Sequence, residues 1–222
     1  RRDVGPPVKR PTQVVLDGST EVDILANVPG ARVAIWWPTP AFLTTDDGRL
    51  DVIANLLSGN RTAWLYWALV DEKRVATAVH THQYSRALGS VFQVLIEGAP
   101  GKSPADILSE FDLAFEGLRK RVVRPKEIDT AVYDYLIDKL LAQDSAATWA
   151  YQYTAYEALV GTADYYGHDI DRYSHITPEL IHEVIDRWLP SDRRIVLLVT
   201  PDPGVVSGGA RRGKHFVPAG TP

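Results

Sequence analysis

Hydrophobic and polar residues alternate in several short segments near both ends of the sequence, and this pattern predicts β-strands. In one of them Phe92, Val94 and Ile96 fall on the same face. A short glycine-containing connection joins that segment to the alternating segment before it, which predicts a hairpin. The predicted strands of this kind cover residues 12–16, 31–38, 75–85 and 90–98, and the short, continuously apolar segment at 193–201 predicts a buried strand.

Apolar residues spaced three and four apart predict helices through the middle of the chain. Ser103 and Thr177 each precede a proline, which is typical of an N-cap followed by the first helical residue. Asp106 completes a pattern like a capping box with Ser103. The predicted helices cover residues 47–59, 61–73, 104–122, a segment that starts at Pro125, and residues 145–161 and 177–190.

Strands on both sides of a long helical middle predict an α+β fold, an antiparallel sheet covered on one face by helices. The sequence has 222 residues, 45% of them hydrophobic and 23% charged, so it can bury a sizeable core. We expect one domain at 12–201. Residues 1–11 are rich in proline and basic residues and predict a linker or arm, and the Gly/Pro-rich residues 202–222 predict a flexible tail.

The charge and composition exclude several classes of function. A net charge of −4 gives no bulk attraction to nucleic acid or acidic membranes. The basic run Arg119 to Arg121 ends a helical pattern, where cations are favourable for a structural reason. The chain has no cysteine, which excludes disulfides, thiolate zinc sites and cysteine nucleophiles.

The sequence leaves the cellular compartment open between bacterial periplasm and cytoplasm. It contains no apolar run of membrane-spanning length and does not open with a signal-peptide pattern. It also contains no methionine, which indicates a fragment, a processed product or a chain with residues lost.

The segment VHTHQYS, residues 79–85, carries the first candidate site. His80 and His82 are two residues apart, so in a strand they point to the same side and could hold a metal ion. A catalytic zinc ion needs about three protein ligands, and no third histidine is near in sequence. The alternative is a partly exposed sheet face that happens to carry two imidazoles.

Other motifs are incomplete. His182 and Glu183 begin like the helical zinc motif His-Glu-x-x-His, but Asp186 stands where the second histidine belongs. The sequence has neither a Gly-x-Ser-x-Gly nucleophile elbow nor a phosphate-binding loop. A tyrosine-rich segment at 150–173 predicts either ordinary packing or a partner surface. From the residues alone, no class of active site is complete.

The order of the segments carries a family resemblance. Residues 50–79, LDVIANLLSGNRTAWLYWALVDEKRVATAV, follow WWPTPAF at 36–42 and precede LGSVFQVLIEGAPGKSPADI; the closing helix and strand are TPELIHEVIDRWLPSDRRIVLLVTP. Taken as an ordered set, these segments resemble the C-terminal domain of the pitrilysin/insulinase family of zinc peptidases, which includes the mitochondrial processing peptidases.

This resemblance implies two homologous halves, of which the N-terminal half binds zinc through His-x-x-Glu-His. The present chain has no such motif, so it resembles the half that does not bind zinc. In many family members that half supplies an arginine and, seven residues later, a tyrosine that hold the peptide. These positions fall on Val70 and Thr77, which cannot do so. No catalytic residue is expected in this chain.

Three functions follow as hypotheses. The first is the non-zinc-binding half of a zinc metallopeptidase, which closes the substrate chamber around a peptide while a zinc-bearing half, in the same polypeptide or a separate subunit, hydrolyses it. The second is a non-catalytic assembly or scaffold protein that keeps the fold. The third is an independent metal-binding module that uses His80 and His82. All three allow a dimer.

Overall fold

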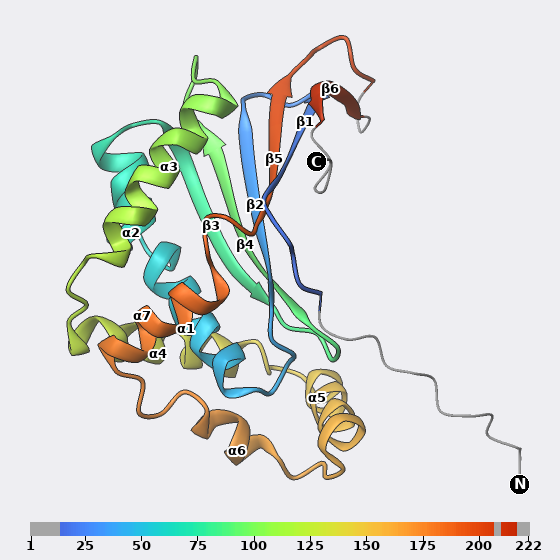
Figure 1. Cartoon of the computed structure of the whole chain (residues 1–222). Coiled ribbons are helices and arrows are strands. Elements are labelled where there is room, and N and C mark those ends of the chain that lie inside the picture. The colour runs from blue at the N-terminus through green and yellow to red at the C-terminus, as the bar shows by residue number, and fades with distance from the viewer. Residues whose placement is uncertain (1–13, 207–209, 217–222) are drawn as a thin grey trace, which may run out of the picture.

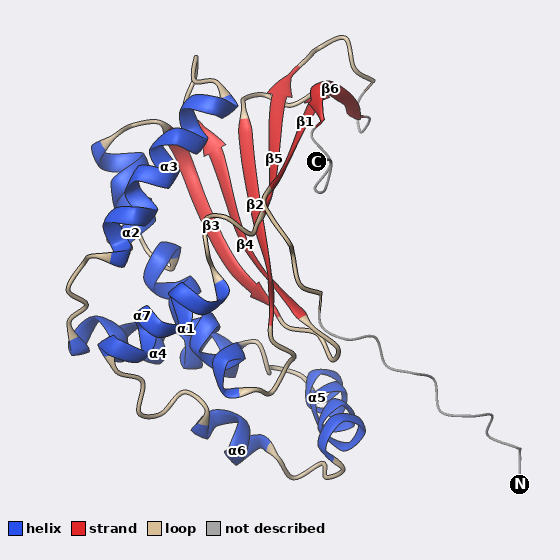
Figure 2. Cartoon of the chain, viewed as in Figure 1, coloured by secondary structure: helices blue, strands red, loops and turns tan. Residues whose placement is uncertain are grey.

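The computed structural model describes residues 14–206 and the backbone of residues 210–216. Six strands form one sheet in the order β3-β4-β2-β5-β1-β6, and the helices gather on one side of it (Figures 1 and 2). The α+β fold is therefore confirmed. The strands are β1 (Thr20–Ala26), β2 (Arg32–Thr39), β3 (Ala76–Tyr84), β4 (Ser90–Gly98), β5 (Ile195–Pro201) and β6 (Ala210–Phe216).

The sheet is mixed, whereas the sequence predicted an antiparallel one. β1 pairs in parallel with β5, and every other pair in the sheet is antiparallel. Parallel neighbours come from distant parts of the chain, so no local pattern predicts them.

The first strand was predicted in the wrong place. Residues 14–16 form no strand, and Val14 and Val15 are exposed; residues 12 and 13 lie outside the described part. β1 starts at Thr20 instead, where Glu21 and Asp23 alternate with Val22 and Ile24. β6 also pairs with β1 inside the range expected to be a tail, and the expected arm at 1–11 lies outside the described residues.

The predicted helix starts at Ser103, Pro125 and Thr177 are confirmed. The Ser103 hydroxyl accepts a hydrogen bond from the Asp106 amide at 3.1 Å, and the Asp106 carboxylate accepts one from the Ser103 amide at 3.1 Å. The helices are α1 (Thr45–Ser58), α2 (Trp64–Tyr66), the π-helix η1 (Trp67–Glu72), α3 (Pro104–Arg119), α4 (Pro125–Leu141), α5 (Ala146–Val160), α6 (Tyr166–Asp171) and α7 (Pro178–Trp188).

One helix was predicted at 61–73, but the structure divides that region. After the short α2 the backbone widens into η1, where the Lys73 amide donates to the Ala68 carbonyl, five residues back, at 3.0 Å. The six-residue helix α6 was not predicted. No described helix is long and apolar enough to cross a membrane.

The core lies between the sheet and the helical layer. Val33, Ile35 and Trp37 of β2 and the predicted apolar face of β4 are buried there. The Trp37 ring stacks on Phe115 of α3 with centroids 6.0 Å apart, and its indole N–H donates to the Pro190 carbonyl at 2.8 Å. This one side chain ties the sheet to α3 and to the loop after α7.

Two glycines give a matched test of this packing. A Cβ atom at Gly98 would lie 2.9 Å from the Ala31 carbonyl oxygen and 2.5 Å from Ile107 Cδ1, whereas nothing surrounds Gly117 on α3. We expect Gly98→Ala to lower the free energy of unfolding by about 1–3 kcal/mol, because the nearby carbonyl group of Ala31 belongs to the backbone just before β2 and cannot move away easily. Gly117→Ala should raise it by about 0.5–1 kcal/mol, since it favours the helix. Urea denaturation measures the free energy of unfolding of both variants. Equal changes in the two variants would contradict the close approach of Gly98 to the Ala31 carbonyl.

Candidate functional site

The face of the sheet that points away from the helices has a mixed apolar and polar character. Strand register places His82, Gln93, Trp36 and Ile195 in one row across β3, β4, β2 and β5. The next row holds His80, Leu95, Ala34 and Leu197. We call this side of the sheet the open face, because the helices lie on the other side (Figure 2).

His80 and His82 lie on the open face, as their spacing predicted. The His82 ring packs edge-on against Tyr84 with centroids 4.4 Å apart. Burial lowers the pKa of His82, and the nearby Arg86 lowers it further, so this imidazole is neutral at pH 7. Within residues 14–206 no group of three His, Cys, Asp or Glu side chains is placed to hold a metal ion.

The two positions that the resemblance assigned to substrate binding have ordinary structural roles. Val70 lies in η1 and packs against the core. Thr77 is exposed on β3, and its hydroxyl donates to the Glu97 carbonyl of the neighbouring strand at 3.3 Å. The side chains of His182 and Glu183 both stand on α7, and the described residues give neither a metal partner.

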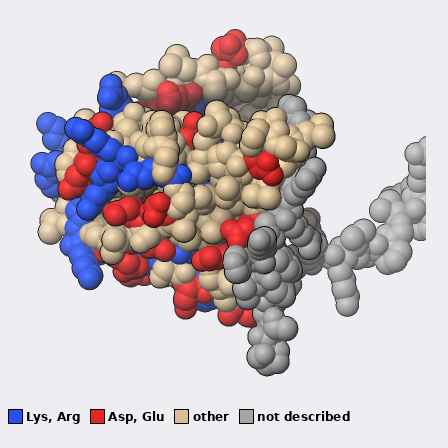
Figure 3. Space-filling view, turned by 90° about the horizontal axis from the view of Figure 1, so that it is seen from above, with Lys and Arg blue, Asp and Glu red and all other residues tan. Residues whose placement is uncertain are grey.

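The basic run at the end of α3 is used in intramolecular contacts. Arg119 donates to the Leu189 carbonyl at 2.6 Å and pairs with Asp186. Arg121 pairs with Glu127 at 2.6 Å and lies over the Trp64 ring, 5.0 Å from its centroid. Seen from above, Lys and Arg side chains gather on the flank of the molecule that the helices form, and acidic side chains lie among them (Figure 3).

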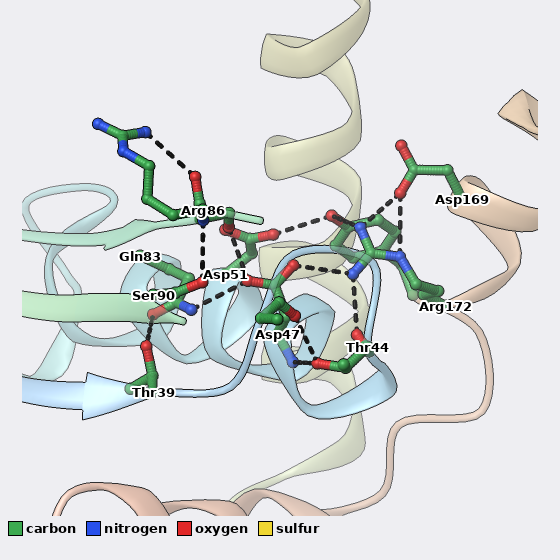
Figure 4. Close-up of polar contacts among 12 residues, drawn as sticks. Thr39, Thr44, Asp47, Asp51, Gln83, Arg86, Ser90, Asp169 and Arg172 are labelled. Carbon is green, nitrogen blue, oxygen red and sulfur yellow. Dashed lines mark hydrogen bonds and ion pairs between the residues drawn. The ribbon is translucent and has the colours of Figure 1, made fainter. Parts of the chain in front are cut away.

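A buried group of polar side chains lies where the helical layer meets the ends of β2 and β3. We call Asp47, Asp51, Tyr156, Asp169, Arg172 and Tyr173 the polar cluster. Asp47 of α1 stands at its centre, between the strand residues and Arg172 (Figure 4). Its carboxylate accepts hydrogen bonds from Gln83 at 3.0 Å, from Ser85 at 2.6 Å and from Arg172 at 3.1 Å.

Arg172 compensates the charge of two buried carboxylates. Its guanidinium pairs with Asp47 and with Asp169 and also donates to the Thr44 carbonyl at 3.0 Å. Asp169 further accepts a hydrogen bond from Tyr156 of α5 at 2.6 Å and pairs with Lys139 of α4 at 3.0 Å. Burial alone would raise the pKa of Asp169, but Lys139, Tyr156 and Arg172 outweigh it and lower the pKa.

For Asp51 the effects that raise the pKa outweigh those that lower it. It lies one helical turn after Asp47, and its carboxyl group accepts a hydrogen bond from the Tyr173 hydroxyl at 2.9 Å. Burial, and then the nearby Asp47 carboxylate, raise its pKa to about 7. Asp51 therefore holds a proton in the folded protein under mildly acidic conditions.

The sequence prediction missed the polar cluster. Its one visible signal was a pair of aspartates, Asp47 and Asp51, which are four apart and therefore lie on the same side of the predicted helix. Of the tyrosine-rich segment, Tyr156 and Tyr173 are buried in the cluster, whereas Tyr153 is exposed. The cluster joins α1, α4, α5 and the end of α6 to the strands. Its buried side-chain polar atoms all have hydrogen-bond partners within the protein, so its role is to hold these elements together.

Comparison with known proteins now gives the family. The model of the peptidase M16 inactive domain matches residues 2–132. The zinc protease PqqE of Helicobacter pylori is 28% identical over 137 residues, which are 60% of this chain and 31% of that protein. The chain thus spans about a third of this curated relative.

Solved structures share the fold. A protease from Helicobacter pylori superposes with a TM-score of 0.76 at 20% identity, over 88% of this chain and 47% of that one. A putative zinc protease from Bordetella pertussis gives a TM-score of 0.68 at 18% identity, over 81% of this chain and 99% of that one. The inactive peptidase domain of a putative zinc protease from Bordetella parapertussis gives 0.68 at 17% identity, over 81% of this chain and 98% of that one.

The raised pKa of Asp51 predicts an unusual pH dependence of stability. Its pKa is about 7 when folded and about 3.9 when unfolded, so the folded state binds the extra proton between these values. Its stabilising effect is complete below about pH 4 and is lost as the pH rises through 7. In the unmodified protein we expect the free energy of unfolding to fall by about 1–4 kcal/mol from this group as the pH rises over this range. Asp51→Asn should remove that fall, because asparagine does not ionise. Urea denaturation from pH 4.5 to 7.5 compares the two proteins; parallel pH profiles would contradict a proton on Asp51.

The histidine pair gives a second prediction. Because the described residues offer no third ligand, we expect less than about 0.1 zinc ion per chain after dialysis against trace zinc. Elemental analysis measures this, with the His80→Ala/His82→Ala variant as the matched control. One zinc ion per chain that the variant loses would make the open face of β3 a metal site.

Proposed function

Because this chain belongs to the family of peptidase M16 inactive domains, we propose that it is the half of a zinc metallopeptidase that does not bind zinc. In this proposal the chain closes the substrate chamber around a peptide. A partner half with the His-x-x-Glu-His motif, on the same polypeptide or a separate subunit, supplies the zinc ion and the general base.

The observation that carries the proposal is a sheet with helices on one face only, in a chain whose sequence lacks the zinc-binding motif of the family. The open face combines the half-buried apolar side chains of Trp36 and Leu95 with the exposed side chains of Val91 and Tyr84. Apolar side chains that remain partly open to solvent on one face are typical of a binding surface. The sequence contains no His-x-x-Glu-His, so the hydrolytic chemistry has to come from elsewhere.

The chain lengths of proteins with a similar fold support the proposal of a partner half. Both the Helicobacter pylori protease and an Enterococcus faecalis protein of similar fold are about twice the length that this chain covers, at 47% and 44% of their chains. The ferredoxin protease FusC was solved in complex with Arabidopsis ferredoxin, and this chain covers 20% of it. The zinc-bearing half and a peptide are therefore the partners that we propose.

One observation favours a second function, a scaffold without catalysis. Val70 and Thr77 occupy the positions where many family members hold the peptide with arginine and tyrosine, and neither can replace those groups. Val70 packs against the core, so it has no donor to offer a peptide. In this alternative the chain assembles with a partner half that also lacks the zinc motif.

Reconstitution tests the proposal. The chain is mixed with a zinc-bearing half from the same source, identified by its His-x-x-Glu-His motif, and hydrolysis of fluorescein-labelled casein is followed. We expect at least about a tenfold higher rate than with either half alone, because closing the chamber positions the peptide at the zinc ion, and loss of activity on zinc chelation.

The control is the same mixture with the motif glutamate of the zinc-bearing half changed to glutamine. It should assemble but not cleave. A stable assembly of the unmodified halves without cleavage would contradict the proposal.

A further inference from the structure

An apolar pocket opens on the sheet beside the β3–β4 connection. Its volume is about 290 Å³. Trp36 and Pro38 of β2, Val91 of β4 and Ile195 of β5 form its walls. Pro38 and Val91 are paired in register, as are Trp36 and Ile195, so these four side chains project from the open face. Leu88 and the segment from Val14 to Leu16 complete its rim.

The chemistry of the lining is almost entirely hydrocarbon. Every residue that lines the pocket is uncharged, and the hydroxyls of Thr39 and Ser90 are its side-chain oxygens. Both are already in use, since Thr39 is hydrogen bonded to Gln83 at 3.1 Å and Ser90 accepts from the Arg86 amide at 3.0 Å. A charged or strongly polar side chain would lose its water here without gaining a partner.

The rim is held in place before any ligand arrives. The Arg86 amide bonds to Ser90 across the connection, and the Arg86 carbonyl accepts from the Phe42 amide at 2.9 Å. Leu88 lies between these anchored residues and remains 47% exposed. Because the walls of the pocket are already ordered, binding of a ligand costs little conformational entropy.

We propose that this pocket binds one large apolar side chain, aromatic or aliphatic, of a peptide held against the open face. The inference rests on the proposed function, which makes the ligand a polypeptide. The volume lies at the lower end of the roughly 300–1,000 Å³ of small-molecule pockets, so it suits one side chain and not a whole cofactor. The pocket makes Leu88 and Val91 specificity-determining residues.

Peptide titration of the whole chain tests the pocket without the zinc-bearing half. Two ten-residue peptides that differ only in a central Phe or Ser are titrated, and backbone amide shifts are followed by NMR. We expect the Phe peptide to bind at least about tenfold more tightly, because burial of an aromatic side chain is favourable by that much or more. The shifts should centre on Leu88, Gly89 and Val91.

Variants distinguish binding in the pocket from non-specific hydrophobic binding elsewhere on the surface. Leu88→Glu should abolish the preference for Phe, and the conservative Leu88→Met should keep it. Leu113→Glu is the matched control, since Leu113 is also exposed, at 66%, but lies on α3 outside the pocket. Thermal unfolding confirms that each variant folds.

Equal affinities for the Phe and Ser peptides, shifts elsewhere on the chain, or an unchanged preference in Leu88→Glu would overturn this inference. None of these results would decide whether the reconstituted halves cleave casein, so failure of the pocket and failure of the proposed function are distinguishable.

Discussion

The ion pair between Asp47 and Arg172 is the contact on which the helical layer depends. It joins α1 to the end of α6, and through Asp169 it extends to α4 and α5, while Gln83 and Ser85 extend it to β3. A buried charge without its partner costs several kcal/mol of stability. Removal of one charged member of the cluster would therefore leave another charge unpaired and destabilise the whole group. Asp51 lowers the local charge by keeping a proton, which allows two carboxylates one turn apart in the same core.

The one-sided placement of the helices sets what the molecule can do. The helices that contact the strands, namely α1, α2, η1, α3 and α7, lie on the face where Val33, Ile35 and Trp37 are buried, so the described core does not need the other face. That other face can then carry features that packing does not require, namely His80, His82 and the apolar pocket. The chain belongs to the family of peptidase M16 inactive domains, and in the described residues the buried polar cluster holds the helices together.

Local signals allowed much of the fold to be predicted. Ser103, Pro125 and Thr177 start helices because caps and first-turn prolines act through neighbouring residues. The parallel pairing of β1 with β5, the π-helical turn after Tyr66 and the polar cluster could not be predicted, because each depends on residues distant in sequence or on burial. For the site, spacing placed His80 and His82 on one face correctly, but the pocket needs four strand residues that only the register brings together.

The pairing of β1 with β5 also has a consequence for synthesis of the chain. The Ser19 hydroxyl donates to the Arg194 carbonyl, 175 positions further on, and β5 then separates β1 from β2 in the sheet. As the polypeptide leaves the ribosome, β2, β3 and β4 can pair while β1 still lacks a neighbour. The edge of β2 stays uncovered until β5 emerges, which is the interval in which a nascent chain is most prone to pair wrongly.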